Sequence, residues 1–271
     1  MHNTIDFAAV VQLAKKAGNA IMAIYGRDFS VETKTDNSPL TEADLAAHHC
    51  IIDGLSIISP TLPVLSEESN NIDWQTRCQW DSYWLIDPLD GTKEFIKRNG
   101  EFTVNIALIN NNRPVWGVVY APAKELLYYG GQLQGQSIRE IGNDRTIIHC
   151  NPVPATAAGW KIVGSKSHQS DEFVELVKRF SEPVIVNLGS SLKICMVAEG
   201  SADLYPRLGL TSEWDTAAAH AVLQGAGGEL YNADTLTALQ YNTKEILLNP
   251  FFHALGKTDS FTHFAERFLH H

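Results

Sequence analysis

The sequence predicts a mixed α and β fold, in the α/β or α+β class, divided into two lobes. Two stretches near the N-terminus place apolar residues at helical spacing, and the middle of the chain alternates β-branched and aromatic residues around turn clusters. A segment rich in proline, glycine and alanine, 150–159, then precedes a region in which strands and helices alternate. We therefore expect an N-terminal α+β lobe over 1–150 and a C-terminal α/β lobe over 151–271.

The N-terminal half predicts two helices followed by strands. The first helix covers 4–25 and stops at Gly26, and the second covers 40–58, with Thr41 as its N-cap and Asp44 in its first turns. Short apolar runs that end in acids predict strands at 62–69 and 82–88, and the run 102–130 predicts an antiparallel meander.

The C-terminal half predicts shorter elements. Strands are expected at 160–165 and 183–190, with a helix between them at 170–180. A helix over 191–200 then precedes a strand over 202–208. The nearly all-apolar run 214–232 predicts a buried helix that is stopped by Gly227 and Gly228.

Composition restricts the partners that this chain can have. The formal net charge is −10 and no Lys/Arg cluster is present, which argues against nucleic acid as the main partner. The four cysteines show no metal or disulfide spacing, and we expect them to be reduced. The N-terminal stretch lacks the continuous apolar core of a signal peptide or a membrane span, so we expect a cytoplasmic protein without an integral membrane segment. Peripheral attachment to the inner membrane and the oligomeric state are left open.

Acidic residues stand where three apolar elements begin or end. Glu67 and Glu68 follow one strand, Asp87 and Asp90 follow the next, and Asp215 opens the apolar helix. If these carboxylates meet in one cleft, their mutual repulsion raises their pKa values unless a cation lies among them. Hard oxygen ligands favour Mg²⁺ over zinc. The alternative is that each acid is a separate helix cap or a solvated turn.

The segment "DPLDGT" gives a physical task to each of its positions. Asp87 ends the strand and the proline fixes a turn, so that the Leu89 carbonyl and Asp90 can reach the same side. Gly91 allows the backbone to pass close to a ligand, and the helix start that follows offers N–H groups to a phosphate. The Thr92 hydroxyl is suited to orient an attacking water, or else it only caps the helix.

The motifs "LSEES", "WLIDPLDGT" and "WDTAAAHAVLQGAGG" together resemble the lithium-sensitive, magnesium-dependent phosphomonoesterases, a superfamily that includes inositol monophosphatases and fructose bisphosphatases. The resemblance implies a layered α-β-α-β-α sandwich and two or three Mg²⁺ ions per site. It implies that Asp44 is an outer metal or water partner and that Thr92 works with Glu67 to activate water. The implied metal ligands are Glu67, Asp87, the Leu89 carbonyl, Asp90 and Asp215, with Glu68 as the alternative to Glu67.

Within that superfamily, "DNSPLTEAD" and "GSSLKICMVAEGSADLYPRLG" most resemble the bacterial 3'(2'),5'-bisphosphate nucleotidases of sulfate assimilation. The resemblance implies removal of the 3'-phosphate of adenosine 3',5'-bisphosphate, giving AMP, and extends to 3'-phosphoadenylyl sulfate. Inositol monophosphatases carry an acid near the Arg207 position, whereas a guanidinium suits a phosphate. The implied substrate contacts are Glu67, Leu89, Asp90, Gly91, Thr92, His168, Ser190, Lys193, Arg207 and Asp215.

Other functions remain open from the sequence. The nearest is an inositol monophosphatase or another sugar-phosphate phosphatase with the same metal chemistry. A two-metal exonuclease would gather aspartates in the same way, but it would need a basic groove. A nucleotide sensor that retains the fold would bind without releasing phosphate.

Overall fold

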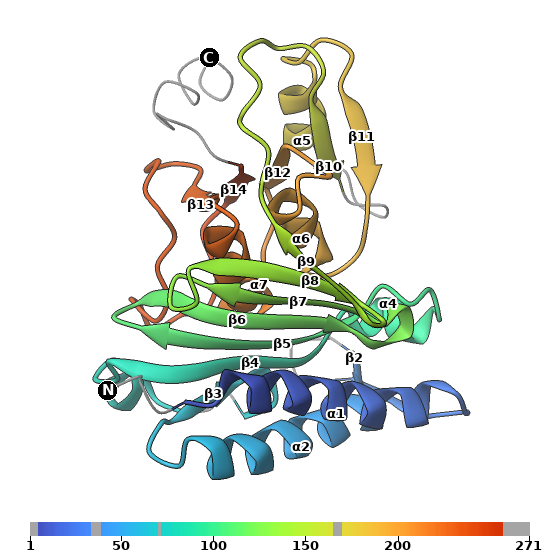
Figure 1. Cartoon of the computed structure of the whole chain (residues 1–271), viewed down its shortest axis with the longest axis vertical. Helices are drawn as coiled ribbons and strands as arrows, with labels where there is room; N and C mark the ends of the chain where they lie inside the picture. The colour runs from blue at the N-terminus through green and yellow to red at the C-terminus, as the bar shows by residue number, and fades with distance from the viewer. Residues whose placement is uncertain (1–4, 34–38, 70–71, 165–169, 257–271) are drawn as a thin grey trace.

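Five layers of secondary structure stack along the long axis of the molecule (Figure 1). The computed structural model describes residues 5–33, 39–69, 72–164 and 170–256. Two helices cover one face of a seven-stranded sheet, two more helices lie between that sheet and a five-stranded sheet, and one further helix covers the outer face. This is the α-β-α-β-α sandwich that the sequence motifs imply.

The first layer consists of the two long N-terminal helices, α1 (Phe7–Tyr25) and α2 (Glu42–Ile58). Both begin at a polar cap: Asp6 accepts a hydrogen bond from the Ala9 N–H, and Thr41 forms a capping box with Asp44. The helix bounds expected from apolar spacing are therefore confirmed to within a few residues.

The seven-stranded sheet forms the second layer and covers most of the first half of the chain. Its strands lie in sequence order, with the first pair parallel and the rest antiparallel: β3 (Val64–Ser66), β4 (Ser82–Asp90), β5 (Thr103–Asn110), β6 (Arg113–Ala121), β7 (Leu126–Gly131), β8 (Gln136–Ile141) and β9 (Asp144–Ile148). Side chains alternate between its faces. Trp84 and Ile86 pack toward α1 and α2, whereas Tyr83 and Leu85 pack toward the middle helices. The predicted meander is confirmed.

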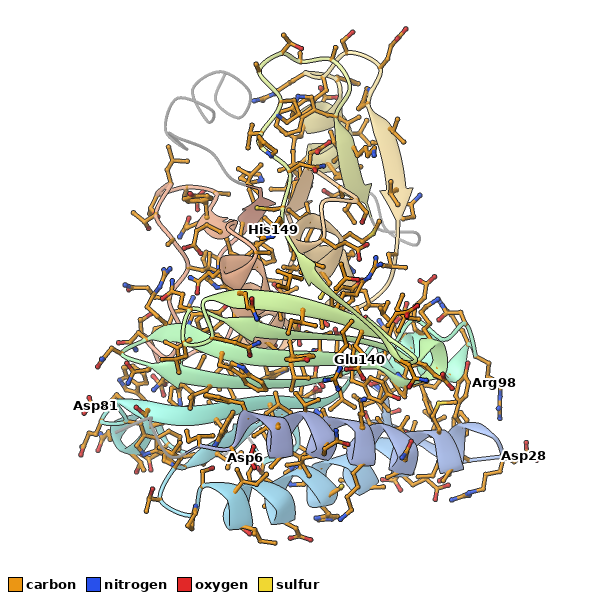
Figure 2. The ribbon with its side chains drawn as sticks, viewed as in Figure 1. Asp6, Asp28, Asp81, Arg98, Glu140 and His149 are labelled. Carbon is orange, nitrogen blue, oxygen red and sulfur yellow. The ribbon has the colours of Figure 1, made fainter. Side chains whose placement is uncertain are left out.

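The hairpin of β8 and β9 was not expected from the sequence. It is tied to the first layer because the buried Glu140 carboxylate on β8 pairs with Lys15 of α1 and with Arg145 of β9, the latter at 2.7 Å (Figure 2). The hairpin thus extends the sheet on which the first helix packs.

The middle layer holds α6 (Leu192–Ala198) and α7 (Glu213–Gly225). α7 lies directly on the seven-stranded sheet: a Cβ at Gly117 of β6 would lie 2.5 Å from the Ala218 carbonyl oxygen. Only glycine permits this approach. α7 ends at Gly225, so the stop predicted at Gly227 and Gly228 is confirmed to within two residues, while the last residues of the 214–232 run form β13.

The outer layers complete the second half. The five-stranded sheet has the order β11 (Val184–Asn187), β10 (Lys161–Gly164), β12 (Leu204–Arg207), β14 (Phe252–Leu255) and β13 (Glu229–Asn232). Val163 and Tyr205 face the middle helices, while Ile162 and Leu204 face α5 (Asp171–Val177). Strands β13 and β14 were not predicted.

Short elements connect these layers. They are β1 (Val31–Thr33), β2 (Pro39–Thr41), the 3₁₀ turns η1 (Glu67–Ser69) and η2 (Pro122–Lys124), α3 (Trp74–Arg77) and α4 (Thr92–Ile96). In the described part of the chain, no helix combines the length and apolarity that a bilayer crossing requires. A division into lobes at residue 150 stays a prediction.

Candidate functional site

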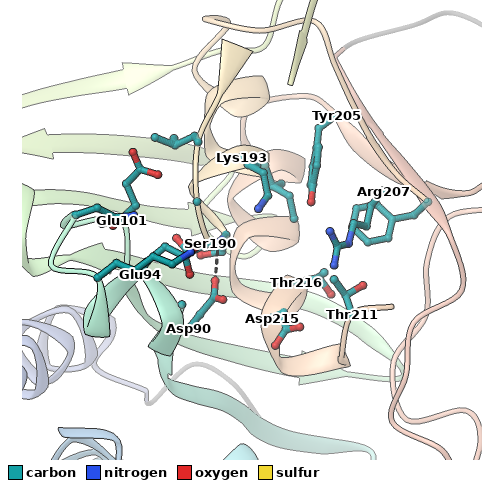
Figure 3. Close-up of a pocket in the computed structure, with 18 residues that line it drawn as sticks. Asp90, Glu94, Glu101, Ser190, Lys193, Tyr205, Arg207, Thr211, Asp215 and Thr216 are labelled. Carbon is teal, nitrogen blue, oxygen red and sulfur yellow. Dashed lines mark hydrogen bonds between the residues drawn. The ribbon is translucent and has the colours of Figure 1, made fainter. Parts of the chain in front are cut away.

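Three carboxylates from two distant parts of the chain meet at the junction of the second and third layers. Asp87 and Asp90 stand at the end of β4, where the pairing with β5 shifts register between them. Asp215 is the third residue of α7. One oxygen from each of these side chains lies within 4.8 Å of the others. Figure 3 shows Asp90 and Asp215 on facing elements at the floor of one pocket.

Burial makes this carboxylate group unfavourable without a cation. It raises the pKa of Asp87 and of Asp215 well above the usual range, and neighbouring carboxylates raise both further. The pKa of Asp90 is raised to about 6 by burial, although the Lys193 ammonium and the Ser191 N–H oppose that shift. The group contains only carboxylate oxygens, which are the ligands that a hard divalent cation prefers. These residues therefore fit a metal of that kind.

The two glutamates after β3 face different acids. The charge and hydrogen bonding of Glu67 raise the pKa of Asp87, and the charge of Glu67 also acts on Asp90 and Asp215. Glu68 instead acts on Asp44. Of the two candidates, Glu67 is thus the one whose charge acts on all three carboxylates of the acid group.

Asp215 and Asp44 are built into their helices in the same way. Each is the third residue of a capping box, with one carboxylate oxygen accepting from the N-cap backbone: Ser212 N at 2.9 Å for Asp215 and Thr41 N at 2.8 Å for Asp44. The second oxygen of Asp215 is left to face the acid group, whereas the second oxygen of Asp44 accepts from the Thr92 hydroxyl. For Asp215, the alternative that the acid is a helix cap therefore describes one of its two carboxylate oxygens.

Thr92 is not the cap of its helix. Gly91 holds the N-cap position with φ of 93°, a left-handed conformation that favours glycine. The Thr92 hydroxyl donates instead to Asp44 Oδ1 at 3.1 Å, and it lies 3.4 Å from the Leu89 carbonyl oxygen. Burial is the main cause of the raised pKa of Asp44. Thr92 and Asp44 thus form a pair at the edge of the acid group.

Six of the ten predicted substrate contacts line a cavity of about 200 Å³ (Figure 3). Its lining has four carboxylates and three cationic side chains among the described residues. Lys193 lies over the Tyr205 ring at 5.6 Å. The predicted residues that line the cavity are Asp90, Gly91, Ser190, Lys193, Arg207 and Asp215.

The other predicted residues are placed differently. Glu67, Asp87, Leu89, Thr92 and Asp44 are not among the lining residues, but Asp87 joins Asp90 and Asp215 in the acid group. His168 lies outside the described residues, so the structure gives no position for it.

Ser190 has a strained backbone. Its φ is 48°, which is uncommon for a residue with a side chain, and it directs the next amide, Ser191 N–H, to Asp90 Oδ2 at 2.5 Å. The Ser191 hydroxyl also lies 2.9 Å from Thr103 Oγ1, which in turn donates to Asp90 at 3.4 Å. Strain of this kind is common at functional sites.

Several contributors were missed in the sequence. Ser191 acts mainly through its backbone amide, which no residue pattern reveals. Tyr205 and Thr211 line the cavity, yet Tyr205 sits in an apolar strand and Thr211 in a loop. Thr211 lies four residues before Asp215, just outside the motif that identified that acid, and this proximity was the one available signal.

Known proteins share this architecture and sequence. A family model described as the inositol monophosphatase family matches residues 3–259. The 3'(2'),5'-bisphosphate nucleotidase CysQ of Salmonella typhimurium strain LT2 is 47% identical over 245 residues, which are 90% of this chain and 96% of that protein. The CysQ of Haemophilus influenzae is 37% identical over 247 residues, 91% of each chain.

Solved structures agree with these relatives. The crystal structure of CysQ from Bacteroides thetaiotaomicron matches with a TM-score of 0.81 and 40% identity, covering 93% of this chain and 97% of that one. The suppressor protein suhB of Bartonella henselae is 21% identical, with a TM-score of 0.72 over 97% of this chain and 98% of its own, and it shows a shared fold. The chain belongs to the inositol monophosphatase family.

Proposed function

We propose that this protein is a magnesium-dependent phosphomonoesterase that removes the 3'-phosphate of adenosine 3',5'-bisphosphate, giving AMP and phosphate. The observation that carries the proposal is the pairing of an acid group at the floor of the cavity with cationic side chains higher in its lining. The names of the curated relatives, 3'(2'),5'-bisphosphate nucleotidases, support the same substrate. 3'-Phosphoadenylyl sulfate carries the same 3'-phosphate and is proposed as a second substrate. With these two nucleotides as substrates, the enzyme would act in sulfur assimilation.

The proposed cofactor is Mg²⁺, with two or three ions per site. Glu67, Asp87, the Leu89 carbonyl, Asp90 and Asp215 would hold them, because hard oxygen ligands and buried negative charge suit this ion. When bound, such ions neutralise the phosphate charge and lower the pKa of a bound water.

The residues of the chain prepare the water and the phosphate. The Thr92 hydroxyl donates a hydrogen bond to Asp44, so its oxygen lone pairs remain free to accept a hydrogen bond from the attacking water. Glu67 takes up the other proton of that water. The capping box at Thr41 fixes the Asp44 carboxylate, and this in turn fixes the Thr92 hydroxyl.

The upper part of the cavity binds the remainder of the substrate. Arg207 and Lys193 supply positive charge for the phosphate that is not hydrolysed, and Ser190 supplies a hydroxyl. His168 is proposed to lie near this group from the motif resemblance alone.

The test is phosphate release from a substrate panel, with Mg²⁺ and with EDTA. The panel contains adenosine 3',5'-bisphosphate, 3'-phosphoadenylyl sulfate, inositol monophosphate and fructose bisphosphate. We expect both nucleotides to be hydrolysed much faster than the sugar phosphates, and only with the metal. A preference for inositol monophosphate would refute the substrate assignment.

The variant Arg207→Glu sharpens this test, because it places an acid where a guanidinium now lines the cavity. We expect it to abolish bisphosphate hydrolysis and to spare any weak activity on inositol monophosphate. The reverse pattern, with nucleotide hydrolysis intact and inositol phosphate hydrolysis lost, would contradict the assignment.

A further inference from the structure

Three buried polar atoms of the cavity lining have no hydrogen-bond partner within the described part of the chain. They are Ser190 Oγ, Arg207 Nε and Thr211 Oγ1. A buried donor or acceptor left without a partner costs about 1–3 kcal/mol. Since the three residues that carry these atoms all line one cavity, a ligand bound there can supply the missing partners. Ser190 and Arg207 already belong to the proposed substrate site, and Thr211 is the unassigned member.

The backbone around Thr211 is held on both sides. The Asn249 N–H donates to the Thr211 carbonyl at 2.8 Å, and the next residue, Ser212, donates its N–H to Asp215 at 2.9 Å. On the other side, Arg207 Nη2 donates to the Leu210 carbonyl at 2.7 Å. Because the backbone is fixed, the Thr211 hydroxyl is restricted to the few positions that the staggered rotamers of the side chain allow.

Thr211 and Arg207 lie on the same side of the cavity, across from Glu94 and Glu101 (Figure 3). Because the guanidinium donates to the Leu210 carbonyl, one residue before Thr211, both side chains belong to one wall of the cavity, and an anion bound at that wall can accept from Arg207 Nε and from the Thr211 hydroxyl. A neutral donor beside a cationic one is an arrangement suited to a phosphate oxygen.

We infer that the Thr211 hydroxyl donates a hydrogen bond to the second phosphate of the substrate, the one that is not hydrolysed, and so helps to select bisphosphates. This inference rests on the proposed function and extends it. Thr211 would thus determine specificity for the second phosphate and take no part in hydrolysis of the 3'-phosphate.

The experiment compares Thr211→Val with Thr211→Ser on two substrates. Adenosine 3',5'-bisphosphate carries both phosphates, and adenosine 3'-monophosphate carries only the one that is hydrolysed. A hydrogen bond to a charged group corresponds to a factor of about ten to a hundred in binding. For Thr211→Val we expect kcat/KM to fall by that factor on the bisphosphate and to be unchanged on the monophosphate. The inhibition constant of AMP, which carries only the second phosphate, should rise by the same factor.

Thr211→Ser keeps the hydroxyl and should stay close to the wild type in all three measurements. Thr146→Val, an exposed change on β9, controls for the loss of a threonine hydroxyl elsewhere. Equal losses on both substrates, or no loss on either, would overturn the inference while the wild-type activity upholds the proposed function. A wild type that is inactive on the bisphosphate would overturn both.

Discussion

Replacing Asp44 with asparagine tests how the attacking water is oriented. The Asp44 carboxylate accepts three hydrogen bonds, from Thr41 N at 2.8 Å, Thr41 Oγ1 at 2.7 Å and Thr92 Oγ1 at 3.1 Å. An asparagine has a single acceptor oxygen, which the two Thr41 donors will claim because they lie closest. Its NH₂ group then faces Thr92, whose hydroxyl must accept instead of donate. The Thr92 proton turns toward the water and opposes its correct orientation.

The expected magnitude follows from this reversal. Water positioning by a side chain contributes about 10²- to 10⁴-fold in rate, and we expect Asp44→Asn to lower kcat by about 10²-fold. Thr92→Val should lose about as much, since it removes the same contact. Stability should fall by less than about 1 kcal/mol, because the oxygen that completes the capping box is retained.

The assay is steady-state phosphate release at saturating Mg²⁺, for both single variants and for the double variant. Because both changes act on one water, the double variant should be about as slow as either single variant. Thr92→Ser keeps the hydroxyl and should retain most of the activity. Losses that multiply in the double variant would refute a shared role, as would an Asp44→Asn variant with full activity.

Three other predictions concern the acid group and the buried hydrogen bonds behind it. Asp90→Asn should slow turnover by about 10³-fold or more, measured as kcat, and near-normal turnover would remove Asp90 from the reaction. The pKa of Asp90 is raised to about 6, so without metal the protonated side chain stabilises the fold fully below about pH 4, and this stabilisation is lost as the pH rises through 6. The melting temperature measured in EDTA should therefore fall over that pH range, and Mg²⁺ should reverse the fall. A melting temperature that does not change with pH would contradict this prediction. Tyr241→Phe removes a buried hydroxyl that lies 2.9 Å from His220 Nδ1 and 3.1 Å from Thr216 Oγ1, so the free energy of unfolding in urea should fall by about 1–3 kcal/mol. The matched change Tyr83→Phe should cost far less, because the buried Tyr83 hydroxyl has no partner among the described residues. Equal losses in the two variants would refute the reasoning.

The sequence predicts the long elements of the fold because their patterns reflect burial. Helices α1 and α2 carry apolar stripes and polar caps, and both were expected at nearly their observed bounds. Strand β9 is mostly exposed, so the apolar alternation that marks a strand is absent there. The end of helix α7 was expected from Gly227 and Gly228, but the short strand β13 that follows these glycines could not be told from the end of the same run.

The acids of the site could be found from the sequence because each stands at the end of an apolar element. Their convergence could not be derived from spacing alone, since Asp215 joins Asp87 and Asp90 only through the packing of α7 on the sheet at Gly117. Contacts made by the backbone, such as the Ser191 N–H to Asp90, carry no side-chain signature.

The sequence also could not decide which of Glu67 and Glu68 belongs to the site, and the structure was needed for that choice. Both acids follow the same short strand, and their order in the chain does not say which one turns toward the cluster. Electrostatics separates them: the charge of Glu67 raises the pKa of Asp87, whereas the charge of Glu68 raises the pKa of Asp44.

The most direct test of the proposed metal site is to soak crystals of the protein in Mn²⁺ and to locate the ion by its anomalous scattering. We predict peaks at coordination distance, about 2.0–2.6 Å, from carboxylate oxygens of Asp87, Asp90 and Asp215. Manganese bound elsewhere on the chain, with no peak at these three side chains while the enzyme still requires metal, would contradict the proposed site.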